Sequence, residues 1–213
     1  MHTYTFKPTL KEVGVLQSRT ESEIENEPML FSADYHFALE HGGPITKEFV
    51  SQLDLSKNWI IDTRVHMLME GWYPCIGGWH CDNIPRNTSN GQPNYKNPAF
   101  ISTHRLAVVD MGTGSLTEFL KDPVLLKDPD DKNKVFGSWS KEINKQIAEG
   151  IISSQKIKSN KIVEFDALMF HRGCKATGKG WRFFIRATTD TPQHAHNKIR
   201  KQVNTYIEAE AGW

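Results

Sequence analysis

The alternation of apolar and polar residues between Lys161 and His171 is the feature that most constrains the fold of this chain. Side chains two residues apart on a strand share a face, so the odd-numbered residues of this segment would lie together and end with the imidazole of His171. The connection from Arg172 to Lys179 contains two glycines and is expected to reverse the chain into a second strand, Trp181 to Thr188. The sequence therefore predicts an antiparallel hairpin near its C-terminal end.

The rest of the chain has the same character, with strand-like segments, long polar connections and few helices. Strands joined without intervening helices favour an antiparallel β architecture. We therefore expect one mainly β domain, residues 1–213, with flanking helices and the double-stranded β-helix of the cupin-like jelly rolls, its core at residues 60–190. The expected strands are Tyr4–Phe6, Trp59–Met69, Phe100–Asp110 and Ile151–Ile157, and the expected helices are Thr46–Leu53, Ser138–Glu149 and a C-terminal helix at 191–213.

Two of these helix predictions depend on capping residues. Thr46 is a plausible N-cap, and Thr191 followed by Pro192 has the pattern of a cap and a first helical position. Two polar stretches, 83–98 and 122–134, have no helical or strand periodicity. The first is long for a loop in a compact domain, and we expect it to be a lid or a substrate-specificity loop.

The charge balance and the hydropathy pattern exclude several classes of protein. The chain has 26 Lys plus Arg against 25 Asp plus Glu, so no bulk field draws it to nucleic acid or to an anionic membrane. No apolar segment reaches membrane-spanning length, and the opening residues lack the basic start and apolar run of a signal peptide. We expect a cytoplasmic protein that acts on a small-molecule substrate, without a membrane partner.

Three side chains have the chemistry of a metal site. His80 and Asp82 are two residues apart, so on an extended strand they leave from the same face about 6.6 Å apart, while Cys81 points the other way. A second imidazole, His171, ends the long strand candidate. Two neutral imidazoles and one carboxylate form the facial triad that binds non-haem Fe(II) and leaves coordination positions open.

A zinc site is the alternative for the same part of the chain. Cys75, Cys81 and Cys174 fall in the same two neighbourhoods as the candidate histidines. They lack the paired short-loop spacing of a structural zinc site, and three cysteines do not form a disulfide framework. We therefore rank zinc below iron.

The order His80-x-Asp82, then His171, then Arg182 eleven positions later resembles the iron(II)- and 2-oxoglutarate-dependent dioxygenases. The segment Glu164–His171 is also similar to the strand that carries the second histidine in the taurine-oxygenase and phytanoyl-like branches of that superfamily. The resemblance covers the whole expected core. It implies that His80, Asp82 and His171 bind Fe(II), that 2-oxoglutarate and O2 occupy the open positions, and that decarboxylation of 2-oxoglutarate is coupled to hydroxylation of the substrate.

The resemblance also assigns Arg182 to the far carboxylate of 2-oxoglutarate. In the expected hairpin Arg182 lies about two residues, or roughly 6 to 7 Å, deeper than His171, which suits the length of the cosubstrate. Arg186 shares that strand face about 13 Å from Arg182, so it either binds an anionic substrate or pairs with an internal carboxylate. Thr103 or Arg105, on a neighbouring strand, could supply a second contact to the far carboxylate.

Substrate class and reaction type have alternatives. Thr188 stands where nucleic-acid demethylases of this superfamily carry a second arginine, which disfavours nucleic acid and leaves a small polar or amino-acid-like metabolite as the expected substrate. A cupin-type metal enzyme would bind metal through the same three ligands but ignore 2-oxoglutarate. A jelly-roll binding module without catalysis would bind its ligand even without His80.

Overall fold

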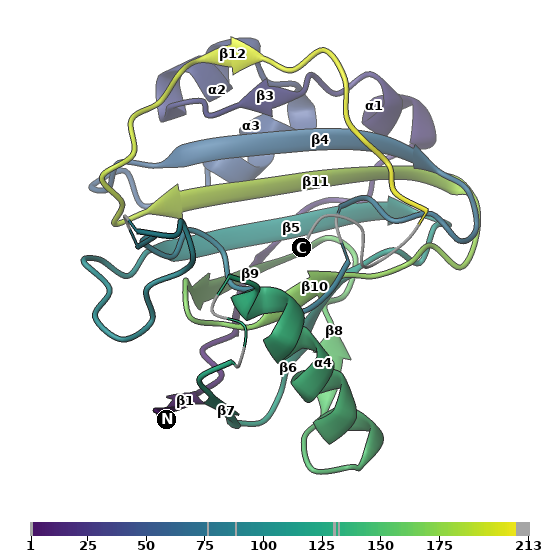
Figure 1. The fold of residues 1–213 in the computed structure, drawn as a ribbon. Helices are drawn as coiled ribbons and strands as arrows, with labels where there is room; N and C mark the ends of the chain where they lie inside the picture. The colour runs from purple at the N-terminus through teal and green to yellow at the C-terminus, as the bar shows by residue number, and fades with distance from the viewer. Residues whose placement is uncertain (1, 76, 88, 130, 132, 208–213) are drawn as a thin grey trace.

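The computed structural model describes residues 2–207 except 76, 88, 130 and 132. Its largest element is a five-stranded antiparallel sheet with the strand order β2-β9-β5-β11-β4. Figure 1 shows β4, β11 and β5 running side by side across the width of the molecule. The strands of this sheet are Lys11–Val15 (β2), Ile60–Leu68 (β4), Thr103–Met111 (β5), Lys161–Asp166 (β9) and Gly180–Thr189 (β11).

Three short helices cover one face of the large sheet (Figure 1). Because strand side chains alternate, Ala107 of β5 and Phe183 and Ile185 of β11 all point to this face, where they are fully buried with Phe49 of α3. Burying a side chain of this size contributes roughly 1.5–3 kcal/mol. The helices are Glu21–Glu25 (α1), Tyr35–His41 (α2) and Pro44–Val50 (α3), and a small antiparallel pair is formed by Leu30–Phe31 (β3) and Lys198–Ile199 (β12).

The opposite face of the large sheet packs against a three-stranded sheet with the order β10-β6-β8. Leu106 and Phe165 of the large sheet are buried with Phe119 of β6, and the ring centroids of Phe119 and Phe165 lie 4.9 Å apart. This face therefore forms the interior between two sheets. The strands of the small sheet are Thr117–Leu120 (β6), Ser154–Lys156 (β8) and His171–Gly173 (β10).

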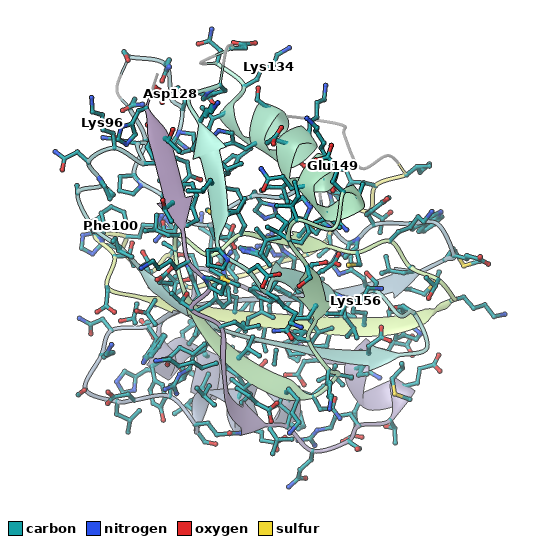
Figure 2. The ribbon with its side chains drawn as sticks, turned by 90° about the horizontal axis from the view of Figure 1, so that it is seen from below. Lys96, Phe100, Asp128, Lys134, Glu149 and Lys156 are labelled. Carbon is teal, nitrogen blue, oxygen red and sulfur yellow. The ribbon has the colours of Figure 1, made fainter. Side chains whose placement is uncertain are left out.

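A further cluster joins α4 to the two-stranded sheet of β1 and β7. Trp139 of α4 is buried with Phe6, and its indole NH donates a hydrogen bond of 2.8 Å to the carbonyl of Lys127. Figure 2 shows β1 and β7 side by side next to α4. These elements are Thr3–Phe6 (β1), Val124–Lys127 (β7) and Val135–Ala148 (α4).

This arrangement confirms a mainly β protein with flanking helices and several antiparallel sheets. The strands expected at 4–6, 59–69 and 100–110 correspond to β1, β4 and β5, and the segment expected at 151–157 contains β8. Their apolar and β-branched residues gave a pattern that the sheet environment reinforces.

The prediction of one strand from Lys161 to His171 is wrong. The side-chain Oδ1 of Asp166 accepts a hydrogen bond of 2.9 Å from the backbone NH of Leu168. The backbone carbonyl of Asp166 accepts another, of 3.1 Å, from the backbone NH of Met169. This turn ends β9 at Asp166, and the chain resumes as β10 at His171. The predicted hairpin is also wrong, because β10 pairs with β6 whereas β11 pairs with β4 and β5.

The helix predicted from Thr46 begins two residues earlier, at Pro44, with Gly43 as the N-cap. Thr46 is therefore not the cap. The buried carboxylate of Glu27 instead accepts the backbone NH groups of Ile45 at 3.2 Å and Thr46 at 2.8 Å. A side chain from outside the helix thus satisfies amides that have no partner within it.

Two further boundaries differ from the prediction. The helix α4 begins at Val135 rather than Ser138, and the stretch 122–134, expected to be an irregular excursion, contains β7. Among the described residues, no helix combines the length and the apolar character needed to cross a bilayer.

The predicted C-terminal helix is wrong over residues 191–207, which contain no helix. Thr191 caps nothing there, β12 pairs with β3, and Tyr73 and Tyr206 exchange two backbone hydrogen bonds of 2.8 and 3.0 Å. The remaining residues of the predicted helix lie outside the described residues. The yellow segment in Figure 1 accordingly runs from β12 back to the edge of the large sheet.

Candidate active site

The structure brings His80, Asp82 and His171 together, as the sequence predicted. One potential ligand atom from each residue lies within 4.8 Å of the other two. The Nε2 atom of His80 is 3.8 Å from Asp82 Oδ1, and the Nε2 atom of His171 is 3.2 Å from Asp82 Oδ2. No cysteine belongs to a potential metal group among the described residues, so the geometry does not support the zinc alternative.

Backbone pairing holds the two histidines side by side. His80 and His171 exchange reciprocal backbone hydrogen bonds of 3.0 Å, so the segment before the 83–98 loop extends the small sheet next to β10. The indole of Trp79 donates a hydrogen bond of 3.0 Å to Asn144 of α4, which fixes this segment from the other side. His80 is therefore held by a sheet edge and a helix rather than by a free loop.

Second hydrogen bonds orient both imidazole rings. Nδ1 of His80 lies 2.9 Å from the carbonyl of Gly78, and Nδ1 of His171 lies 3.0 Å from the carbonyl of Met169. A carbonyl only accepts, so each Nδ1 donates a hydrogen bond to that carbonyl, and each ring turns its Nε2 toward Asp82. Metal-binding histidines are commonly oriented by this kind of second hydrogen bond.

The electrostatics of the cluster favour a cation between the three side chains. Burial, reinforced by His171, lowers the pKa of His80 to about 4, so its ring is neutral near pH 7. Burial raises the pKa of Asp82, but Arg186 and His171 outweigh it and hold the carboxyl well below its usual range. An ionised carboxylate beside two imidazole Nε2 atoms is a donor set that a divalent metal ion satisfies, because the ion displaces any proton held between them when it binds.

Arg182 lies deeper in the same interior and is 3% exposed. Its Nε donates a hydrogen bond of 2.6 Å to the carbonyl of Ser115, and its guanidinium lies 5.6 Å from the ring centroid of Phe184. Within the described part of the chain it forms no ion pair. Burial lowers the pKa of Arg182 to about 10, which is the expected response of a cation without a counter-ion.

Arg186 is on the same face of β11 but has two carboxylate neighbours. Its Nη1 contacts Asp82, and its Nη2 lies 4.0 Å from Asp62. Of the two predicted roles for Arg186, pairing with an internal carboxylate is the one found. That carboxylate belongs to a candidate metal ligand.

The sequence-based placement of Thr103 and Arg105 at the site is wrong. Arg105 donates a hydrogen bond of 2.9 Å from Nε to Glu164 and another of 2.5 Å to the carbonyl of Gln52, and its guanidinium lies over Trp59. Thr103 is two residues away on the same strand and therefore shares this face. Both side chains belong to the helix-covered side of the sheet.

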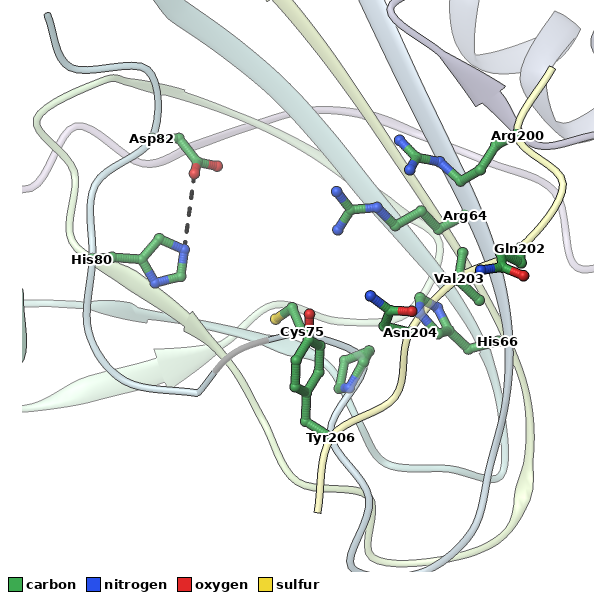
Figure 3. A pocket seen from close by; sticks show the side chains of 11 residues that line it. Arg64, His66, Cys75, His80, Asp82, Arg200, Gln202, Val203, Asn204 and Tyr206 are labelled. Atoms are coloured by element: carbon green, nitrogen blue, oxygen red, sulfur yellow. Dashed lines mark ion pairs between the residues drawn. The ribbon is translucent and has the colours of Figure 1, made fainter. Parts of the chain in front are cut away.

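Two connected chambers surround the triad. The inner chamber, about 190 Å³, is lined by His171, Thr117 and Arg182, and the outer chamber, about 430 Å³, is lined by Asn204 and Tyr206 of the C-terminal segment. Figure 3 shows the outer chamber, with His80 and Asp82 on one side and the C-terminal segment on the other. The residues common to both chambers are Arg64, His66, Pro74, Cys75, His80 and Asp82.

The sequence analysis missed Arg64 and the C-terminal segment as parts of this site. Arg64 lies on the strand predicted at 59–69, with Asp62 and His66 two residues away on either side, so the strand period placed three polar side chains on one face. That signal was available. The C-terminal segment gave none, because its position depends on backbone pairing with distant residues.

The polar loop at 83–98 lines a separate cavity of about 610 Å³. Arg186 and Phe136 also line this cavity, and Arg186 lines the inner chamber as well. Tyr95 packs its ring against Phe6 with centroids 5.3 Å apart. The role of the loop as a lid stays a prediction.

No family model matches the chain, and no curated protein sequence matches it. Among solved structures, an N-substituted L-amino acid dioxygenase from Burkholderia ambifaria AMMD is 14% identical, with a TM-score of 0.40 over 68% of this chain and 57% of that one. AviO1 from Streptomyces viridochromogenes Tue57 is 11% identical, with a TM-score of 0.43 over 88% of this chain and 92% of that one. HygX from Streptomyces hygroscopicus with iron bound is 8% identical, with a TM-score of 0.40 over 89% and 85%. This chain spans little more than half the length of the Burkholderia enzyme, and likenesses at this level do not assign a function.

Proposed function

We propose that this protein is an Fe(II)- and 2-oxoglutarate-dependent oxygenase. The observation that carries the proposal is a juxtaposition within one cavity. Two imidazole Nε2 atoms and the carboxylate of Asp82 converge beside an inner chamber that contains Arg182, a buried cation with no ion-pair partner in the described chain. A dianionic cosubstrate that chelates a metal at one end and needs a cation at the other would fit both features.

His80, Asp82 and His171 would hold the metal ion, and hydrogen bonds to the carbonyls of Gly78 and Met169 keep the imidazoles in the binding tautomer. When bound, the metal would supply the oxygen chemistry that the protein side chains cannot provide. The proposed set leaves positions open for a cosubstrate and for O2.

Arg182 would bind the far carboxylate of 2-oxoglutarate. Its Nε is fixed by the carbonyl of Ser115, which leaves the outer edge of the guanidinium for a charge-assisted contact. The aromatic rings of Phe119 and Phe165 pack around His171, at 5.4 and 5.3 Å between centroids, and exclude water from that side of the triad.

The proposal also includes a fold, the double-stranded β-helix, and a substrate class, small polar or amino-acid-like molecules. Two antiparallel sheets that enclose a polar interior suit a double-stranded β-helix, and we treat residues 1–213 as one such domain acting in the cytoplasm. The outer chamber is of a size that accepts a small molecule, which supports a small polar or amino-acid-like substrate.

Anaerobic addition of Fe(II) and 2-oxoglutarate tests the proposal. We expect the visible charge-transfer band of a chelated 2-oxo acid when both are present, and no band with either alone. His171→Ala should abolish the band. His36→Phe is the matched control, since it removes an imidazole on α2, which covers the other face of the large sheet.

A wild-type protein that binds metal without forming the band would contradict the use of 2-oxoglutarate and favour the cupin-type alternative. Retention of metal by His171→Ala would contradict the ligand set itself.

A further inference from the structure

We propose that Arg64 binds an anionic group of the substrate, so that the substrate is a small molecule bearing a carboxylate, sulfonate or phosphate. This inference rests on the proposed function, because it assigns 2-oxoglutarate to Arg182 in the inner chamber. The substrate would then occupy the outer chamber, with its anion on Arg64 and its reacting carbon toward His80 and Asp82.

The position of Arg64 follows from the register of the large sheet. Arg64 is directly opposite Phe184, and its neighbours Asp62 and His66 on β4 are opposite Arg186 and Arg182. Side chains of directly paired residues share a face, so all six point into the interior between the sheets. Arg64 lines both chambers, and Figure 3 shows its guanidinium extending into the outer one.

The side chain of Arg64 makes no hydrogen bond and no ion pair with any residue that the structure describes. Its guanidinium lies over the ring of Phe184, 5.8 Å from the ring centroid. Burial, together with the nearby Arg186 and Arg200, lowers the pKa of Arg64. A partly buried cation among other cations raises the free energy of the folded protein, and a bound anion would remove that cost.

The charges lining the two chambers point to an anion beyond the cosubstrate. Three carboxylates face the arginines of this interior. Asp62 and Asp82 pair with Arg186 and Arg200, and Asp110 is opposite Arg182 on β5, where its carboxylate accepts hydrogen bonds from Thr113 and the backbone NH of Gly114. A divalent metal ion and a dianionic 2-oxoglutarate add no net charge when they bind together. Four arginines against three carboxylates leave one positive charge, and the cation without an assigned anion is Arg64, in a lining that also includes Arg182, Arg186 and Arg200.

The outer chamber also offers neutral hydrogen-bond donors near Arg64. The side chains of Gln202, Asn204 and Tyr206 line it from the C-terminal segment. Amide NH2 and phenol OH groups donate to the oxygens of an anion while adding no charge of their own. These groups are held in place because Tyr206 exchanges backbone hydrogen bonds with Tyr73.

The test uses protein saturated with redox-inert Mn(II) and with 2-oxoglutarate, titrated with three matched pairs of small molecules. The pairs are propionate and propionamide, methanesulfonate and methanesulfonamide, and glycerol 3-phosphate and glycerol. We expect the wild-type protein to bind at least one anion more tightly than its neutral partner. Arg64→Gln should weaken that binding ten-fold or more, and the preferred pair would show which anion the site takes.

Arg105→Gln is the matched control, because it removes one arginine charge from β5 on the other face of the sheet, where Arg105 pairs with Glu164. Anion binding should survive in this control. Undiminished anion binding in Arg64→Gln, or equal binding of anions and neutral partners by the wild type, would overturn the inference.

The same variants separate this inference from the proposed function. If Arg64→Gln loses 2-oxoglutarate as completely as Arg182→Ala does, Arg64 belongs to the cosubstrate site and the substrate inference fails. The oxygenase proposal survives that result. Absence of the Fe(II)–2-oxoglutarate band in the wild type would instead remove the proposed function.

Discussion

Arg182 and Arg186 are four residues apart on the same face of β11, and the protein surrounds them differently. On β4, Arg186 is opposite Asp62 and Arg182 is opposite His66. On β5, Arg182 is opposite Asp110, but that carboxylate accepts hydrogen bonds from Thr113 and the backbone NH of Gly114 and forms no ion pair with Arg182. Arg186 also contacts Asp82, while the hydrogen bond of Arg182 goes to a neutral backbone carbonyl, that of Ser115. One strand therefore presents a paired and an unpaired guanidinium to the same interior.

The pKa values of the two arginines report this difference. Burial lowers the pKa of both, but Asp82 and Asp62 outweigh it for Arg186, whose pKa is raised, whereas that of Arg182 falls to about 10. A buried cation with its anions in place contributes to the architecture of the site. A buried cation without them favours the binding of an external anion, which is why we assign the cosubstrate to Arg182.

The largest expected effect comes from removing Asp82, which forms an ion pair with Arg186. Asp82→Ala leaves Arg186 with only Asp62 at 4.0 Å, and loss of one partner from a buried pair costs about 3 to 5 kcal/mol of the free energy of unfolding. The variant should also lose metal binding, measured by anaerobic calorimetry. Urea unfolding of the metal-free protein gives the stability, and a loss below about 1 kcal/mol would show that the pair does not support the site.

Removing Arg182, the unpaired arginine, should weaken cosubstrate binding without lowering the stability of the protein. Arg182→Ala is expected to weaken 2-oxoglutarate binding by roughly 1.5 to 3 kcal/mol, or about ten-fold to more than a hundred-fold, because the far carboxylate loses a charge-assisted contact. Titration of the Fe(II) chelate band measures this. Arg182→Met, which keeps much of the side-chain volume, should not lower the free energy of unfolding, since it removes a buried charge without a partner. Unchanged 2-oxoglutarate affinity would contradict the assignment.

The strand face that each of these side chains occupies could be predicted from the sequence. The period of two on a strand placed Arg182 and Arg186 on one face, and it placed His80 beside Asp82. The convergence of these two with His171 was expected from the resemblance to a known superfamily. What the two arginines contact was not predictable, because it depends on pairing between segments that are far apart in the chain. Strand alternation indicates which face a side chain occupies, but not what covers that face.

The same reasoning explains the errors in the fold. The strand at 161–171 was extended too far because Asp166 ends it through a side-chain turn that leaves the alternation of apolar residues intact. The segment from Thr191 has helical periodicity, yet its backbone pairs with β3 and with Tyr73. In both places a hydrogen bond that periodicity does not encode decides the structure.

The pH dependence of stability probes the neutral partner of Arg182. Burial, with Arg182 and Arg64 adding to it, lowers the pKa of His66 to about 3. Because this value lies below the unfolded value of about 6.5, the unfolded chain binds the proton first as pH falls, and the free energy of unfolding decreases over that window. Between pH 7 and pH 5 this residue accounts for a loss of about 2 kcal/mol.

His66→Phe should remove that part of the pH dependence, measured by urea unfolding of the metal-free protein at both pH values. His36→Phe is the control, since it replaces an exposed imidazole on α2 and should leave the dependence unaltered. An equally steep dependence in His66→Phe would show that folding does not lower the pKa of His66 and would contradict the effect of burial on this residue.

The smallest expected effect belongs to an arginine outside the comparison. Arg105 pairs with Glu164 at 2.9 Å, and both side chains are partly exposed, at 19% and 28%. Exposed pairs contribute about 0.2 to 1 kcal/mol, so Arg105→Gln should lower the free energy of unfolding by that amount and leave 2-oxoglutarate affinity unchanged. A loss of affinity approaching that of Arg182→Ala would mean that charge anywhere on the large sheet, rather than a guanidinium inside the inner chamber, attracts the cosubstrate. Equal affinities in Arg105→Gln and the wild type would restrict the electrostatic argument to the interior face, where the unpaired guanidinium of Arg182 lies.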